Sequence, residues 1–304
     1  MRLGTSTNLF AQHRLNSEKP PYIEQLRFCR EAGFKVLDLG LGTTTKKPKK
    51  QEDLKAPDWE ARIDALANEA AKLGVDFTQA HSPICGDFFI KGAQPDAEFT
   101  EFYNEMMRRS IIACEKLGIK WMTVHPLSDN VHTEFELDVI KNTNIEFFSP
   151  WVDLAKKHHV GIAFENMPEK ADSVQVRRYC SSADELIDLV DTFNDPAVGI
   201  TWDFGHAKMM YNDQPRQLRK LGKRLKATHV QDTNASRDSH LIPFVGGSVA
   251  WEDIMPCLKE IGYEGDFVFE CHRFMNEVPD ALRMSAAKLA YDFGMYCMDL
   301  YDKA

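Results

Sequence analysis

Eight short runs of apolar residues recur along the chain, and longer helical patterns separate most of them. Each run is rich in Val, Ile, Leu and Phe and is too short for a helix, which is typical of a buried strand. The runs are Arg2–Ser6, Val36–Leu39, Val75–Ala80, Trp121–His125, Gly161–Glu165, Val198–Asp203, Ala227–Val230 and Asp266–Glu270. Strands that alternate with helices predict a parallel sheet whose two ends are chemically distinct.

The helical segments show where this alternation starts and stops. They are Tyr22–Ala32, Trp59–Leu73, Phe99–Leu117, Ala183–Val190, Ile254–Ile261 and Ala281–Tyr301. Four of them are followed directly by glycine, which is a common helix stop signal. An open doubly wound sheet is disfavoured because no glycine-rich loop follows the first strand. We therefore predict an α/β protein with a single domain over residues 1–304, folded as a (β/α)8 TIM barrel.

Ionisable side chains stand at the carboxyl ends of the third to eighth predicted strands. They are His81, His125, Glu165, Asp203, His206, His229, Asp232 and Glu270. In a parallel barrel these strand ends meet at one face, where active sites lie. A charged group at the end of a buried strand costs free energy unless it is paired or bound to a metal. The pattern predicts a ring of functional groups at that face.

Each of these residues also has a purely structural interpretation. Asp203 could simply cap the following helix, and His81 and His125 could pack and donate to the backbone. Asp38, at the end of the second strand, could orient a ligand or cap a helix. Taken as a group, the residues favour function over structure.

Four of the strand-end residues have the composition of a metal site. Glu165, Asp203, His229 and Glu270 would give an oxygen-rich site with one nitrogen. This composition suits one divalent ion of Mn, Co, Mg or Zn better than a metal selected by thiolates.

With these motifs the chain resembles the xylose-isomerase-like TIM barrel superfamily, in its sugar phosphate isomerase/epimerase branch. The resemblance runs from Arg2 to about Tyr296. It depends on Phe164-Glu165-Asn166, Trp202-Asp203-Phe204-Gly205-His206, His229-Val230-Gln231-Asp232, Arg237–Pro243 and Phe269-Glu270. Two departures are Phe244-Val245, inserted before Gly246, and Ala235, where some keto-sugar epimerases carry an arginine.

The resemblance implies a metal-dependent sugar isomerase or epimerase. Its metal ligands would be Glu165, Asp203, His229 and Glu270, and the two glutamates would also be the catalytic acid/base pair. We expect six further residues to bind the substrate: His81, His125, His206, Asp238, His240 and Arg273. Such an enzyme removes a proton next to a carbonyl, and the metal stabilises the resulting enediolate.

A second branch of the superfamily, the zinc-dependent apurinic endonucleases, offers an alternative. Those enzymes hold three metal ions, and this chain has a residue of suitable type at each corresponding ligand position, from His81 to Glu270. The phrases that follow Glu165 and His229 differ from theirs, and a net charge of −9 disfavours nucleic acid as a partner. A sugar or cyclitol ketone dehydratase with the same proton abstraction is a further alternative.

The remaining features concern location and partners. The N-terminus becomes polar too soon for a signal peptide, and no apolar run reaches the roughly 18 residues of a membrane span. Seven widely spaced cysteines indicate reduced thiols rather than disulfides. We therefore expect a cytoplasmic enzyme with a small sugar or sugar-like substrate and no membrane partner. Whether Ala281–Tyr301 closes the barrel or joins a homo-oligomer is left open.

Overall fold

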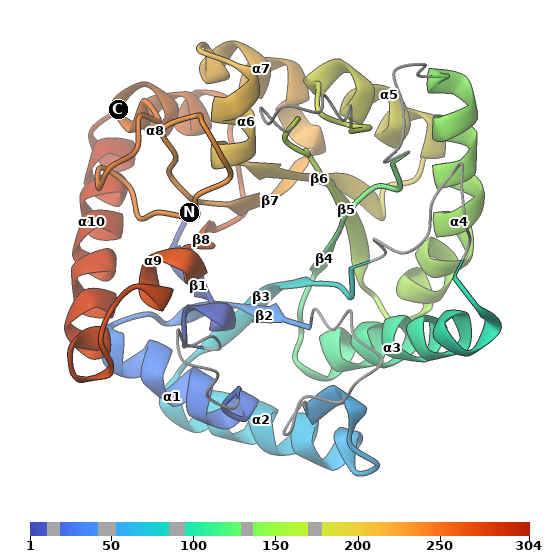
Figure 1. Cartoon of the computed structure of the whole chain (residues 1–304), viewed down its shortest axis with the longest axis horizontal. Coiled ribbons are helices and arrows are strands. Elements are labelled where there is room, and N and C mark those ends of the chain that lie inside the picture. Colours follow the sequence, from blue (N-terminus) through green and yellow to red (C-terminus); the bar gives the residue numbers. More distant parts are fainter. Residues whose placement is uncertain (11–18, 42–52, 85–94, 129–135, 170–177) are drawn as a thin grey trace.

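Eight parallel strands form a ring at the centre of the molecule (Figure 1). The computed structural model describes residues 1–10, 19–41, 53–84, 95–128, 136–169 and 178–304. The strands are β1 Leu3–Ser6, β2 Val36–Gly40, β3 Asp76–His81, β4 Trp121–Val124, β5 Gly161–Glu165, β6 Val198–Asp203, β7 Leu225–His229 and β8 Phe267–Phe269. All eight predicted strands are confirmed; β5 and β6 have the predicted bounds, and the other six differ by one or two residues at an end.

The sheet curls so that its first and last strands in space nearly meet. The strand order is β7-β6-β5-β4-β3-β2-β1-β8. Val230, just after β7, donates to Val268 O at 2.8 Å and accepts from Glu270 N at 2.9 Å, which joins β7 to β8. This arrangement confirms the predicted TIM barrel.

Helices surround the ring on its outer side (Figure 1). They are α1 Tyr22–Ala32, α2 Trp59–Leu73, α3 Ala97–Lys116, α4 Leu137–Lys157, α5 Ala183–Phe193, α6 Phe204–Met210, α7 Gln214–Leu221, α8 Trp251–Glu260, α9 His272–Asn276 and α10 Arg283–Lys303. Short 3-10 turns are η1 Thr7–Phe10, η2 Asp53–Lys55, η3 Gly222–Arg224 and η4 Asp280–Leu282. In the part of the chain described, no helix combines the length and apolarity needed to cross a membrane.

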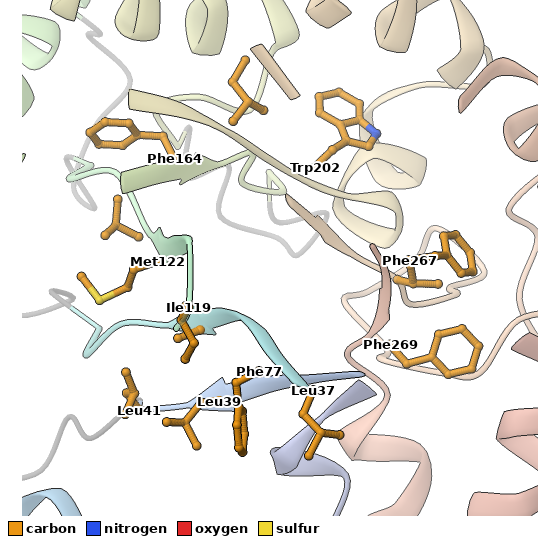
Figure 2. Close-up of a cluster of buried hydrophobic side chains, with 14 of the residues drawn as sticks. Leu37, Leu39, Leu41, Phe77, Ile119, Met122, Phe164, Trp202, Phe267 and Phe269 are labelled. Carbon is orange, nitrogen blue, oxygen red and sulfur yellow. The ribbon is translucent and has the colours of Figure 1, made fainter. Parts of the chain in front are cut away.

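The hydrophobic core lies between the strands and the helices. Figure 2 shows Phe164, Trp202, Phe267 and Phe269 pointing away from the ring of strands, and all four are fully buried. Because side chains alternate along a strand, their neighbours point into the barrel. Glu165 follows Phe164 in this way, so the outward apolar residues anchor the strands while the inward ones supply the chemistry.

The last helix, α10, packs against α1 and α8 and so belongs to the outer layer of the barrel (Figure 1). Tyr291 on α10 meets Phe34 edge-on, with ring centroids 5.2 Å apart. The same helix also leaves Leu289 and Tyr296 exposed. The first of the two expectations for this segment, closure of the barrel, is therefore confirmed.

A cavity of about 550 Å³ lies at the amino-terminal ends of the strands. Arg2, Lys120, Trp121, Lys226 and Asp266 are among its lining residues. The ionisable groups predicted to be functional lie at the other ends of the strands, so this cavity is not the candidate site.

Candidate active site and metal centre

The four predicted metal ligands meet inside the carboxyl-terminal end of the barrel. Glu165 ends β5, Asp203 ends β6, His229 ends β7 and Glu270 follows β8. One potential ligand atom from each lies within 4.8 Å of those of the other three. His229 Nδ1 is 3.0 Å from Glu165 Oε1 and 3.5 Å from Glu270 Oε2. The sequence prediction that these side chains come together is therefore consistent with the geometry.

A second set of contacts orients the His229 ring. Its Nε2 lies 3.6 Å from Asp38 Oδ2, and Gln79 Nε2 donates to the same oxygen at 2.8 Å. Asp38 is buried in the middle of β2 and caps none of the described helices. It occupies the position of a carboxylate that holds a metal-ligating histidine by its far nitrogen.

The protonation of these groups reflects their crowding. Burial raises the pKa of Asp203 to about 7, and the negative charges of Glu165 and Glu270 add to this effect. Burial opposes ionisation of Glu165 too, but the charges and hydrogen bonds of His229 and His125 together outweigh it and leave the Glu165 pKa well below its usual range. The pKa of His229 is raised well above its usual range because the two glutamates outweigh its burial.

Asp203 both caps a helix and faces the centre. Its Oδ1 accepts from His206 N at 2.7 Å at the start of α6, while Oδ2 lies 3.4 Å from Gln231 Nε2. Asn166 holds its backbone from both sides, since Asn166 Oδ1 accepts from Asp203 N at 2.7 Å and Asn166 Nδ2 donates to Asp203 O at 3.0 Å. The structural and functional interpretations of Asp203 are therefore compatible.

His81 and His125 form a second cluster on the far side of Glu165. Their Nε2 atoms are 3.1 Å apart, and those of His125 and His81 lie 3.1 Å and 3.6 Å from Glu165 Oε2. His81 Nδ1 donates to Ser82 O at 2.9 Å, which turns its Nε2 toward the cluster. The two rings thus face the glutamate and do more than fill space.

His206, Asp238 and His240 form a third cluster, which a glutamine ties to the centre. His240 Nε2 lies 3.0 Å from Asp238 Oδ2, and His206 Nε2 lies 3.6 Å from Asp238 Oδ1. Gln231 Nε2 donates to Asp238 Oδ1 at 2.6 Å, and Gln231 Oε1 accepts from His240 N at 2.9 Å. Gly205 makes room for this amide, because a Cβ there would be 2.3 Å from Gln231 Cδ.

These contacts set the charges of the third cluster. Burial opposes protonation of both imidazoles, but neighbouring carboxylates raise the pKa of His206 to about 10 and that of His240 to about 9. Burial likewise opposes ionisation of Asp238, yet hydrogen bonds from the two imidazoles hold its pKa far below the usual range. The cluster is cationic overall at neutral pH.

Asp232 proves to be structural. Its Oδ1 accepts from Thr233 N and Val249 N at 2.8 and 3.0 Å, and its Oδ2 accepts from Trp251 Nε1 and Phe244 N at 2.9 and 3.1 Å. The buried carboxylate therefore folds the loop between β7 and α8.

The inserted pair Phe244-Val245 lies at the outer edge of that loop. The Phe244 ring meets Phe293 and Tyr296 of α10, with centroids 6.0 and 5.4 Å away. The insertion is thus accommodated outside the ring of ionisable groups.

Two arginines and a further histidine complete the rim. Arg273 on α9 donates from Nη1 to Asp238 O, and its Nη2 lies 3.8 Å from Asp238 Oδ2. The His272 ring contacts that of His240 in a tilted arrangement, with centroids 4.1 Å apart, and burial lowers the pKa of His272 to about 3. Arg178 precedes the buried Tyr179. Burial lowers the Arg178 pKa, and the charge of Asp238 offsets part of this effect.

All ten predicted site residues therefore lie together, with Arg273 at the rim. The sequence reasoning missed Gln79, Asn166, Gln231, His272 and Arg178. Of these, Asn166 and Gln231 had a signal, since they stand inside the Phe164–Asn166 and His229–Asp232 motifs.

The donor set fits a divalent cation. Glu165 Oε2 is buried and accepts no hydrogen bond of good geometry from any described residue. Carboxylate oxygens and one imidazole nitrogen at this spacing are the ligands that Mn, Co, Mg or Zn accept. The two flanking clusters also offer three potential ligand atoms each.

Comparison with known proteins agrees with the fold. A family model described as xylose isomerase-like TIM barrel matches residues 26–289. L-ribulose-5-phosphate 3-epimerase UlaE of Salmonella heidelberg is 23% identical over 265 residues, which cover 86% of this chain and 85% of that protein. The uncharacterized protein MJ1311 of Methanocaldococcus jannaschii is 26% identical over 164 residues, 53% of this chain and 54% of that protein.

Solved structures share the whole architecture. A D-tagatose 3-epimerase-like protein superposes with a TM-score of 0.74 and 19% identity, covering 100% of this chain and 99% of the other. The IOLI protein, solved with a bound zinc atom, superposes with a TM-score of 0.72 and 18% identity, covering 100% and 99%. At these identities the likeness establishes the fold alone.

Proposed function

The chain belongs to the xylose isomerase-like TIM barrel family, and on that premise we propose that it is a divalent-metal-dependent sugar epimerase or isomerase. The observation that carries this proposal is the meeting of Glu165, Asp203, His229 and Glu270 within 4.8 Å. Relatives named as sugar 3-epimerases support the same class of reaction.

The four clustered residues would hold the metal, and a bound divalent ion would stabilise the negative charge that develops on the substrate oxygens. Glu165 and Glu270 approach the centre from β5 and β8, on different sides of the ring. One carboxylate removes the proton next to the carbonyl, and the other returns a proton from the opposite side. An epimerase needs two such groups because the new C–H bond forms on the other face of the carbon.

Neighbouring residues would orient the substrate and keep these groups in place. The imidazoles of His81 and His125 face Glu165, and His206 faces Asp238. These imidazoles and carboxylates would form hydrogen bonds with the hydroxyl groups of a sugar from two sides of the site. Asp38 holds the His229 ring from behind. Holding the carboxylate and the substrate C–H group in the correct geometry lowers the barrier to proton transfer.

Exchange of a substrate proton with solvent tests the proposal. Mn²⁺-loaded protein incubated with keto-sugars in deuterium oxide should incorporate deuterium next to the carbonyl. Glu165→Gln and Glu270→Gln should each abolish incorporation and turnover, whereas Glu101→Gln, on the exposed face of α3, should retain both. Metal content measured for each variant separates loss of the base from loss of the ion. Full activity in either glutamine variant would contradict the assignment.

A second candidate function follows from the two flanking clusters. The groups His81–His125–Glu165 and His206–Asp238–His240 each place three potential ligand atoms within 4.8 Å of one another. With the central group they would suffice for three ions, as in a zinc-dependent phosphodiesterase. The net charge of −9 argues against a DNA-binding face.

Metal content per chain decides between the two candidates. One ion, measured by elemental analysis of protein purified without chelator, agrees with the epimerase. Three zinc ions, together with cleavage of an oligonucleotide that contains an abasic site, would instead establish the phosphodiesterase.

A further inference from the structure

The rim of the site beside Asp238 carries two arginines, and one of them has no hydrogen-bond or ion-pair partner among the described residues. Arg178 is partly buried, yet it makes no hydrogen bond or ion pair with any described residue. A guanidinium has five N–H donors, and burying it without acceptors costs free energy. Burial accordingly lowers the Arg178 pKa. Such a group is suited to binding an acceptor that comes from outside.

The backbone next to Arg178 is fixed over the barrel mouth. Tyr179 N donates to Ser128 Oγ at 2.8 Å, which joins this segment to the loop after β4. Met167 N, two residues beyond the catalytic Glu165, donates to Cys180 O at 3.0 Å. The backbone that follows Arg178 is therefore held against Ser128 after β4 and Met167 after β5, at the carboxyl-terminal ends of the strands.

The charges at this rim do not cancel. The negative charge of Asp238 favours the charged form of Arg178 and so opposes the effect of burial on the Arg178 pKa. The same carboxylate lies 3.8 Å from Arg273 Nη2. Its two oxygens are already engaged by Gln231 Nε2 at 2.6 Å and His240 Nε2 at 3.0 Å. One carboxylate that is occupied in this way does not by itself neutralise two guanidinium groups.

We propose that Arg178 and Arg273 together bind an anionic group of the substrate, so that the substrate is a keto-sugar phosphate or a keto-sugar acid and not a neutral sugar. The planar guanidinium matches both phosphate and carboxylate oxygens and pairs with either through two parallel hydrogen bonds. The arginines come from the segments after β5 and β8, the same strands that carry the two glutamates. This inference rests on the proposed sugar-enzyme function and adds the substrate's charge.

Binding measured by calorimetry on the Mn²⁺-loaded protein tests the proposal without relying on turnover. The probes are a pentulose 5-phosphate, a keto-aldonic acid and the neutral pentulose. We expect one of the two anions to bind at least about tenfold more tightly than the neutral sugar, because hydrogen bonds to charged groups carry roughly a tenfold to hundredfold gain each. Whichever anion is preferred identifies the source of the charge.

Matched variants connect that preference to the arginines. Arg178→Met keeps an apolar stem and should remove most of the preference while leaving the neutral pentulose unaffected, and Arg178→Lys should restore part of it. Arg216→Met, at an exposed position of α7, should change nothing. Equal affinity for all three probes, or an unchanged preference in Arg178→Met, would overturn the proposal. Anion preference without any proton exchange would instead contradict only the proposed epimerase function.

Discussion

Replacing Asp203 by Asn should stabilise the metal-free protein at alkaline pH while removing its response to metal. Asp203 is fully buried between Glu165 and Glu270, and its pKa is raised from 3.8 to about 7. The folded protein therefore holds a proton there more tightly than the unfolded chain does. The resulting penalty is absent below about pH 4, grows as the pH rises, and is complete above about pH 7.

The size of the effect follows from that shift. Each pKa unit corresponds to about 1.4 kcal/mol, so a shift of this size implies a penalty on the order of 4 kcal/mol. Asparagine cannot ionise, and its Oδ1 still accepts from His206 N at the start of α6. It does place an amide opposite the donor of Gln231, which offsets about 1 kcal/mol of the gain. A net gain of a few kcal/mol should raise the unfolding midpoint by several degrees.

Thermal unfolding of both proteins in chelator, from pH 4 to pH 8.5, measures this difference. Asp203→Asn should be the more stable protein at pH 8 and should lose that advantage near pH 4. Saturating Mn²⁺ should reverse the order at pH 8, because only the wild type retains the full ligand set. Parallel stability curves over the whole pH range would refute the reasoning.

Two further substitutions probe the supports of the site. Gly205→Ala places a Cβ 2.3 Å from Gln231 Cδ, so the glutamine must move and release Asp238. We expect overpacking to lower the free energy of unfolding by about 1–3 kcal/mol and turnover to fall as well. Urea titration and steady-state kinetics measure the two effects. Unchanged values in both would contradict this expectation. Trp251→Phe removes the indole donor of buried Asp232 and should cost about 1–3 kcal/mol in the same titration with little change in bound metal. Loss of metal in this variant would show that Asp232 is more than structural.

Much of the fold could be predicted because its signals are local. Each strand is a short apolar run, and α1 and α2 have the predicted bounds, Tyr22–Ala32 and Trp59–Leu73. The helix α4, Leu137–Lys157, was missed although its buried residues recur at helical spacing, because Pro150 stands inside it and a proline usually ends a helix. The helices α6, α7 and α9 were missed because they are only a few residues long.

The candidate site was predictable for a different reason. Parallel strands bring their carboxyl ends to one face, so the position of Glu165 or Glu270 along its strand was sufficient to place it. The supporting contacts depend on pairs far apart in sequence, such as Gln79 with Asp38, which are 41 residues apart. No local pattern reveals such a pair. Neutral amides such as Gln79 also attract no attention in a search for ionisable residues.

Three of the site's histidines share a feature that bears on how such a barrel could acquire new specificities. His81, His206 and His240 each donate from Nδ1 to a backbone carbonyl, at Ser82, Asn166 and Glu270 respectively. Those carbonyls lie just beyond β3, β5 and β8, so the barrel itself fixes the tilt of each ring. Exchange of the longer surface loops would alter which molecule enters while the imidazoles stay preorganised, and selectivity and reactivity could then evolve separately.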